Sequence, residues 1–381
     1  MEINHKRMQM SGNLAFFFSG ICAISSGVVV SLLQERFGFA YGMTGTLLSL
    51  MSIGNLLASF AAGMLPGRIG MKKSVLLLTT GYGIGYLLMT LTGQIGVLML
   101  AFLLVGIAKG SALNTCTVMV GNHADNKTKG MNIMHACYAC GALLCPFVIS
   151  IALFGGTWLP TIVLAVLGIV VWTIFGTAGL SSTTAKADGK KIDWSFLKSG
   201  KFWVLTGLLF CQNAAETSVT GWLVTYFKGN GILSGTLSTY TVTVMWGATL
   251  LARLLIAFVL PIKNAAKAMI GMGLGCTVLY FGLIQAQSGV AAIVMLFLFA
   301  ASMAGMNPTA VACAGKQLNV TSMGIMLPVA ALGAILMPWI IGIVAEHVNL
   351  QVGMMCNIVP CAGLLVFGLL SLKYLGKAEE A

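Results

Sequence analysis

Windows of about 20 mostly apolar residues recur along the whole chain and constrain its fold more than any other feature. A bilayer's hydrocarbon core is about 30 Å thick, so a helix needs a window of this size to cross it. With 58% hydrophobic and 8% charged residues, the composition excludes an ordinary soluble domain. The windows are too long and too uniformly apolar for barrel strands, and lipid allows no other spanning structure than helices. An all-α integral membrane protein is therefore predicted.

Twelve of these windows are predicted to be transmembrane helices. The first six lie at about 12–32, 41–62, 73–93, 95–120, 130–153 and 157–178, and the second six at about 201–227, 236–259, 266–287, 289–313, 320–343 and 350–372. The polar, Lys-rich stretch SSTTAKADGKKIDWSFLKSGK separates the two sets. We expect an N-terminal six-helix bundle at 1–180, a cytoplasmic linker at 181–200 and a C-terminal six-helix bundle at 201–381, a plan typical of transporters with a midplane site between related halves.

The basic residues indicate the orientation of the chain. With the N-terminus inside, 17 of the 21 Lys and Arg residues fall in inner segments, two (Arg36 and Lys228) fall outside, and two (Lys109 and Arg253) fall within helices. Short cytoplasmic loops collect positive charge, so both termini are predicted to be cytoplasmic in a multi-pass protein of the cell membrane. The net charge of +12 is then explained by topology and anionic lipid, without a nucleic-acid partner.

The ten cysteines fall almost entirely in apolar windows and are interpreted as small buried hydrophobes. Cys137 and Cys140 form one C-x-x-C pair, but no second pair lies nearby to complete a metal site. We expect no metal, no cofactor and a monomer. An enzyme is also not expected, because a catalytic site needs convergent acids, histidines or a nucleophile, and three of the four histidines lie outside the apolar cores.

Glu216 is the one acidic residue that lies deep inside a predicted span. A charge at that depth costs at least about 2.5 kcal/mol on insertion scales, so the carboxylate needs a partner, water or a proton. On a helix, Gln212 and Thr220 lie four residues to either side of Glu216 and Asn213 lies three residues before it, so all share roughly one face. Such a stripe is typical of the wall of a water-filled cavity.

Other polar residues in the predicted spans leave alternatives open. Lys109 is the only other charge near a helix midpoint. His135 is interpreted as a structural histidine or, alternatively, as a proton relay. Pro308 predicts a kink in the tenth span that releases backbone carbonyls beside Asn307. Trp222 could stack on a sugar ring or anchor the helix at the membrane interface.

The loop GMLPGRIGMKK between the second and third spans resembles the cytoplasmic signature of the major facilitator superfamily. The matching residues are Gly63, Arg68, Gly70 and Lys72. The signature's acidic position is Gly67 here, and its second basic position is Met71. The second half has a looser copy, ARLLIAFVLPIKNAAK, which keeps Arg253. Arg68 and Arg253 are therefore expected near the cytoplasmic side, as gating residues or as structural ties between helix ends.

Three stretches are similar to a narrower group, the fucose:proton symporters and their bacterial relatives. AETSVTGWLVTYF resembles the seventh helix of that group, and HACYACGALLCP and GMNPTAVACAG resemble its fifth and tenth helices. The fourth helix departs from the pattern, because AKGSALNTCT offers Lys109 and Asn114 where sugar symporters of the group carry an acid. The resemblance implies that the first, fourth, seventh and tenth helices line the cavity, so Lys109 and Glu216 are expected to face it and to form a salt bridge. That pair either locks the halves together or is interrupted by solute or protons.

The leading hypothesis is a secondary transporter that moves a small polar solute, sugar-like or anionic, by alternating access and is coupled to protons. The alternative is an exporter of drugs or metabolites with the same fold. The residues expected to couple protons or bind the solute are Glu216, Lys109, Gln212, Asn213, Asn114, Asn307, His135 and Trp222.

Overall fold

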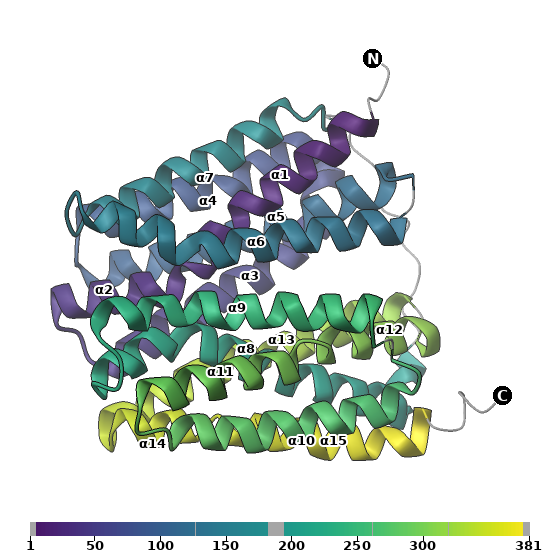
Figure 1. The fold of residues 1–381 in the computed structure, drawn as a ribbon. Helices are drawn as coiled ribbons and strands as arrows, with labels where there is room; N and C mark the ends of the chain where they lie inside the picture. Colours follow the sequence, from purple (N-terminus) through teal and green to yellow (C-terminus); the bar gives the residue numbers. More distant parts are fainter. Residues whose placement is uncertain (1–4, 126, 182–193, 261, 319, 376–381) are drawn as a thin grey trace. The chain divides into compact units, whose positions relative to one another are not determined.

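The structure is a computed structural model that describes residues 5–125, 127–181, 194–260, 262–318 and 320–375. All regular secondary structure in these ranges is helical (Figure 1), which confirms the predicted all-α class. The physical reason is that a helix satisfies its backbone hydrogen bonds internally, as lipid requires.

The chain divides into two compact units, Met1–Phe39 with Thr46–Gly189 (unit 1) and Ala40–Gly45 with Lys190–Ala381 (unit 2). The sequence division at 181–200 did not foresee that the short segment Ala40–Gly45 belongs with unit 2. The contacts explain its place, because the Gly42 N–H donates a hydrogen bond of 2.9 Å to the Glu346 carboxylate.

Unit 1 contains the first seven helices, except for the first residues of the third helix, which belong to unit 2. They are α1 (His5–Ile24), α2 (Ser26–Phe37), α3 (Tyr41–Ile69), α4 (Met71–Leu91), α5 (Ile95–His123), α6 (Lys127–Leu153) and α7 (Leu159–Thr177). Unit 2 begins its helical structure with a 3-10 turn, η1 (Trp194–Lys198), and continues with eight helices in the described ranges. They are α8 (Gly200–Gly229), α9 (Gly235–Phe258), α10 (Ala265–Ile284), α11 (Gly289–Met303), α12 (Met306–Gln317), α13 (Val320–His347), α14 (Leu350–Met355) and α15 (Ile358–Leu375).

Eleven helical segments in the described ranges are long and apolar enough to cross a membrane. The first of them joins α1 to α2, another joins α11 to α12, and the last joins α14 to α15. The predicted seventh span, α8, is not among the eleven, because polar residues interrupt its apolar sequence. Its 30 residues nevertheless span about 45 Å at 1.5 Å per residue, which is more than the core thickness.

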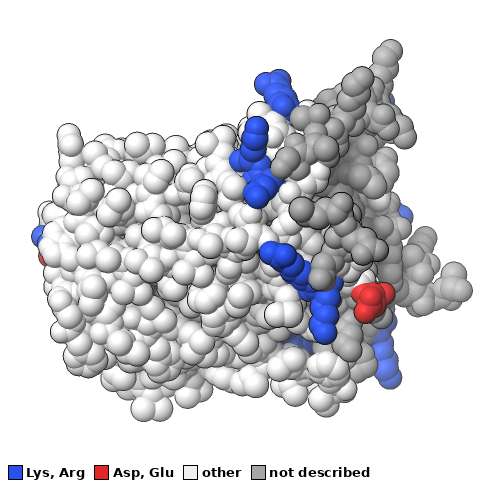
Figure 2. Space-filling view, turned by 90° about the horizontal axis from the view of Figure 1, so that it is seen from above, with Lys and Arg blue, Asp and Glu red and all other residues white. Residues whose placement is uncertain are grey.

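Charge and exposed apolar surface agree with a membrane environment. Figure 2 shows Lys and Arg side chains gathered at one end of the visible face, and the rest of that face is almost without charge. Large apolar side chains such as Leu91, Ile151 and Val290 are exposed along the helices. Exposed apolar area on this scale is a surface that lipid covers.

Glycines allow the closest helix contacts inside each unit. In unit 1 a Cβ atom on Gly141 of α6 would lie 2.0 Å from the backbone oxygen of Phe17 in α1. In unit 2 a Cβ atom on Gly333 of α13 would lie 2.1 Å from the backbone oxygen of Phe210 in α8. Only glycine fits such approaches, which is the packing that small residues provide between membrane helices.

The first span is interrupted between α1 and α2, at Ser25. The Ser25 hydroxyl donates to the Cys22 backbone oxygen at 2.7 Å and also lies 2.7 Å from the Tyr86 hydroxyl, which itself donates to the Cys22 oxygen. Close by, the hydroxyls of Ser19 and Tyr82 are hydrogen-bonded at 2.6 Å. These buried groups satisfy one another with neutral donors and acceptors.

Candidate functional site

Glu216 lies near the middle of α8 and is partly buried. The Gln212 side-chain amide, one turn earlier, donates a hydrogen bond of 3.0 Å from Nε2 to the Glu216 carboxylate. Gln212 is only 1% exposed, and its Oε1 has no hydrogen-bond partner among the described residues. The amide therefore supports the carboxylate with one end and leaves a buried acceptor at the other.

The same helix carries two further buried oxygens without a partner in the described part of the chain, Ser218 Oγ and Thr225 Oγ1. Asn213 of the predicted stripe is partly buried, and the Thr220 hydroxyl lies 3.6 Å from the Met245 sulfur of α9. A buried polar group without a partner costs about 1–3 kcal/mol, so several on one helix require a reason. A site that receives solute, protons or water supplies one.

Asn357, which the sequence interpretation missed, contributes to this region from the interruption between α14 and α15. Its side chain is 0% exposed, and Nδ2 donates to the backbone oxygen of Ala215, next to Glu216, at 3.4 Å. Its Oδ1 lacks a partner in the ranges that the structure covers. The available signal was a single asparagine within the apolar run MMCNIVPC.

The tenth span, in which Pro308 predicts a kink, ends as α11 at Met303 and resumes as α12 at Met306. Asn307 lies in the first turn of α12 and is partly buried. Arg253 of α9 reaches this interruption, where its Nε donates to the backbone oxygen of Ala304 at 3.2 Å. Arg253 thus makes a structural contact with a helix end.

The environment of Trp222 is neither an open sugar-binding surface nor the membrane interface. Its side chain is 0% exposed, and its indole N–H donates to the backbone oxygen of Pro338 in α13 at 3.1 Å. A ring that stacks on a sugar or anchors a helix at the interface has to be accessible. The structure instead makes Trp222 a packing residue between α8 and α13.

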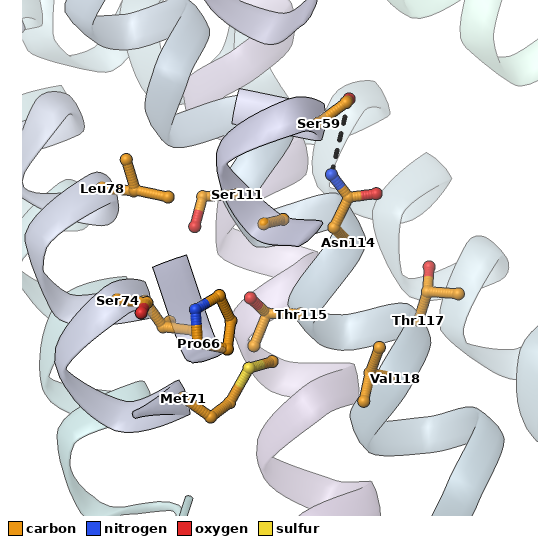
Figure 3. A pocket seen from close by; sticks show the side chains of 12 residues that line it. Ser59, Pro66, Met71, Ser74, Leu78, Ser111, Asn114, Thr115, Thr117 and Val118 are labelled. Carbon is orange, nitrogen blue, oxygen red and sulfur yellow. Dashed lines mark hydrogen bonds between the residues drawn. The ribbon is translucent and has the colours of Figure 1, made fainter. Parts of the chain in front are cut away.

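In unit 1, Asn114 borders a pocket of about 280 Å³ formed by α3, α4 and α5 (Figure 3). Its Nδ2 lies 3.5 Å from the Ser59 hydroxyl, and the other polar groups that line the pocket are hydroxyls, Ser74, Ser111, Thr115 and Thr117. Lys109 is partly buried in the middle of α5 but does not line this pocket. Of the two predicted residues of α5, only Asn114 therefore borders this pocket.

His135 and Arg68 are both exposed. The His135 ring lies edge-on to Phe16, with 5.7 Å between ring centroids. This aromatic contact corresponds to the structural interpretation of His135 rather than to a relay buried inside the span. Arg68 lies in the last turn of α3, one residue before the helix ends.

Of the predicted residues, the structure brings Glu216 and Gln212 into direct contact. Asn213, Asn307, Trp222 and Arg253 belong to the same unit, whereas Lys109, Asn114, His135 and Arg68 belong to unit 1. The Lys109–Glu216 salt bridge would join the two units and stays a prediction. Within the described residues, no group of three or more His, Cys, Asp or Glu side chains could hold a metal ion.

Known sequences resemble this chain along most of its length. The profile described as Major Facilitator Superfamily matches residues 13–338. The protein named Bypass of stop codon protein 6 from Saccharomyces cerevisiae is 22% identical over an alignment of 382 residues, gaps included. The alignment covers 89% of this chain and 77% of the yeast protein.

Two solved structures have a similar fold. A crystal structure of a mutant of the nucleoside transporter NupG aligns with a TM-score of 0.79 at 12% identity and covers 95% of this chain and 99% of its own. A bacterial homolog of the human lysosomal transporter Spinster, in an inward-facing and unoccupied conformation, aligns with a TM-score of 0.78 at 13% identity over 99% of this chain and 98% of its own. At this level of identity the similarity shows the fold alone.

Proposed function

Because the chain belongs to the major facilitator superfamily and is therefore a membrane transporter, we propose that it moves a small polar solute by proton-coupled alternating access. The solute is sugar-like or anionic, and Glu216 carries the proton. The proposal includes a monomer in the cell membrane. Its termini are placed in the cytoplasm because of the distribution of Lys and Arg.

The observation that carries the proposal is the Gln212–Glu216 contact in α8. A carboxylate within a membrane helix is costly and usually marks a pathway for protons or solute. The ionised carboxylate accepts the Gln212 N–H, whereas a protonated one has an O–H to donate. The amide oxygen of Gln212, which is buried and unpartnered among the described residues, can accept that O–H after the amide rotates. Gln212 thus has a partner atom for each protonation state of Glu216.

The class of solute is proposed from the other buried polar atoms. Ser218 Oγ and Asn357 Oδ1 lack partners in the described residues, and both can accept hydrogen bonds from hydroxyl or amide groups of a solute. Sugars and nucleosides carry such donors. The presence of Lys109 on α5 extends the proposal to anionic solutes.

The first experiment identifies the solute and tests coupling. Purified protein is screened for thermal stabilisation by sugars, nucleosides, organic acids and amino acids, because a ligand that binds only the folded state raises the unfolding temperature. The solute with the largest effect is then labelled and its uptake into proteoliposomes is measured under an inward proton gradient. Glu216→Gln is expected to lower accumulation at least about tenfold, because glutamine cannot carry the proton, while counterflow exchange continues. A tenfold loss corresponds to about 1.4 kcal/mol of lost coupling.

The matched control is Glu346→Gln, at an exposed carboxylate of α13. Glutamine keeps an oxygen that can accept the Gly42 N–H, so this variant is expected to accumulate solute normally. Undiminished accumulation by Glu216→Gln would remove Glu216 from the coupling mechanism. A proton gradient of either sign across the same vesicles distinguishes import from export, since an inward gradient drives solute uptake by a proton symporter and an outward gradient drives solute uptake by a proton-coupled exporter.

A further inference from the structure

The interruption of the tenth span leaves a backbone carbonyl that its own helix cannot satisfy. In a helix, each carbonyl oxygen accepts the N–H of the residue four positions later. Four positions after Ala304 stands Pro308, which has no N–H. Ala304 is buried, so water does not replace the missing donor freely. Its oxygen therefore needs a donor from another element.

Arg253 of α9 supplies this donor through Nε, 3.2 Å from the Ala304 oxygen. The last carbonyls of a helix have no N–H partner within it, so a donor from another element is the usual way to satisfy them. The next carbonyl, that of Gly305, accepts from the backbone N–H and the hydroxyl of Thr309 at 3.1 Å and 2.7 Å. Both carbonyls of the interruption thus have a definite partner.

The packing around the interruption is equally specific. A Cβ atom on Gly305 would lie 2.8 Å from Ile256 Cδ1 of α9 and 2.5 Å from Met272 Cε of α10. Ile256 follows Arg253 by three residues and lies on the same side of α9. One face of α9 therefore contacts both residues between α11 and α12.

Prolines in this protein lie both inside continuous helices and beside an interruption, as Pro360 does at the start of α15. Pro66 in α3, Pro146 in α6, and Pro328 and Pro338 in α13 all lie inside helices that continue past them. At the interruption before Pro360, the Cys356 oxygen accepts the backbone N–H of Val359 at 3.1 Å. In the tenth span, a side chain from a neighbouring helix instead bonds the carbonyl that the proline leaves without a donor.

We propose that Arg253 is a positioning residue, whose Nε–H replaces the amide that Pro308 lacks and thereby fixes the start of α12 and its Asn307. The inference rests on the proposed function only for the role of Asn307 as a solute-binding residue. It requires a hydrogen-bond donor at the position of Nε and does not require the positive charge. A gating role for Arg253 would require the charge instead.

Two substitutions separate the donor from the charge. Arg253→Gln places its Nε2, an uncharged donor, the same number of bonds from the backbone as Nε of arginine. Arg253→Lys keeps the charge but places a methylene group at that point. Arg253→Met removes both. Gln is therefore expected to behave like the wild-type residue, and Lys like Met.

A third substitution removes the need for the donor. Pro308→Ala restores a backbone N–H four residues after Ala304, so the helix can satisfy its own carbonyl. Arg253→Met is then expected to have little further effect in the Pro308→Ala chain. The two residues are thus expected to be strongly coupled in a double-mutant cycle.

The readout is the alkylation rate of the native Cys313, a half-buried residue of α12, by N-ethylmaleimide. The rate is measured in the full-length protein by peptide-resolved mass spectrometry, with the exposed Cys140 of α6 as the internal reference. Arg253→Met and Arg253→Lys are expected to raise the Cys313 rate at least about threefold, and Arg253→Gln to leave it within about twofold of wild type. If Arg253→Met does not fold, the comparison of Gln with Lys decides alone.

Protection of Cys313 by Lys but not by Gln would overturn the inference in favour of a charge-dependent role. Equal sensitivity to Arg253→Met with and without Pro308→Ala would overturn it as well. The alkylation assay needs neither solute nor a proton gradient. Normal accumulation by Glu216→Gln in the uptake assay would therefore refute proton coupling through Glu216 and leave the Arg253 inference standing. Conversely, an overturning alkylation result would refute the Arg253 inference and leave proton coupling standing.

Discussion

The helix pair α1 and α6 in unit 1 and the pair α8 and α13 in unit 2 pack in nearly the same way. Gly141 and Gly333 each approach a phenylalanine carbonyl so closely that a Cβ atom would lie 2.0 Å and 2.1 Å from it. The backbone nitrogen four residues after that phenylalanine would lie 3.2 Å from the Cβ atom in α1 and 3.1 Å in α8. The same local contact is thus built twice, once in each unit.

The chemistry carried on this repeated contact differs. With Phe17 placed on Phe210, Ala23 of α1 corresponds to Glu216 of α8, and Ser19 corresponds to Gln212. Ser19 is hydrogen-bonded to Tyr82, whereas Gln212 bonds Glu216 and keeps an oxygen without a partner in the described ranges. Close helix packing therefore does not need the carboxylate, because α1 packs as closely with an alanine at the matching position. The comparison supports a functional reason for Glu216.

The largest expected effect comes from breaking the shared contact. Gly141→Ala and Gly333→Ala would each drive a methyl group into a backbone carbonyl, and overpacking of this kind costs about 2–3 kcal/mol. The controls are Gly96→Ala in α5 and Gly271→Ala in α10, where a Cβ atom meets nothing within 4 Å. These are expected to be neutral or to stabilise by up to about 1 kcal/mol. The free energy of unfolding in detergent measures all four, and equal values for sites and controls would contradict the packing argument.

A smaller effect is expected from the neutral hydroxyl network of unit 1. Tyr86→Phe removes a hydroxyl that contacts both Ser25 and the Cys22 backbone oxygen, and the loss should cost about 1–3 kcal/mol of unfolding free energy. Tyr82→Phe, which loses only the contact with Ser19, should cost about 1 kcal/mol. Per folded molecule, both variants are expected to transport at the wild-type rate. A selective loss of transport without loss of stability would show that unit 1 also contributes chemistry here.

The smallest effect on stability is expected at Gln212, where the comparison places function above stability. Gln212→Met removes one hydrogen bond and also one buried oxygen that has no partner in the described part of the chain, so the net change should be within about 1 kcal/mol. Proton-driven accumulation is nevertheless expected to fall, because Glu216 loses the partner for both of its protonation states. Thr206→Val is the matched control on α8, since its hydroxyl bonds only the Phe202 carbonyl one turn earlier. Normal accumulation by Gln212→Met would show that Glu216 acts without this amide.

Sequence patterns predicted contacts within one helix better than contacts between helices. The four-residue spacing of Gln212 and Glu216 predicted that they share a face, and the structure bonds them directly. Pro308 indicated the interruption of the tenth span, whereas the interruption at Ser25 and the one at Asn357, three residues before Pro360, were not predicted. Asn357 was missed because its contact with the Ala215 carbonyl depends on how the interruption between α14 and α15 packs against α8. The burial of the Trp222 ring was not predicted for the same reason, since burial of a ring depends on its neighbours.

By itself, the sequence determined that the chain forms membrane-spanning helices and that one carboxylate lies deep within them. Both properties depend on the transfer of whole segments from water to lipid, which is a sum over local composition. Only the tertiary structure decided which glycine meets which carbonyl, that Arg253 bonds the oxygen of Ala304, and that Gln212 keeps an oxygen without a partner among the described residues. These depend on the rotation and depth of each helix against its neighbours, and packing distances of a few ångströms are not encoded in the composition of any single segment.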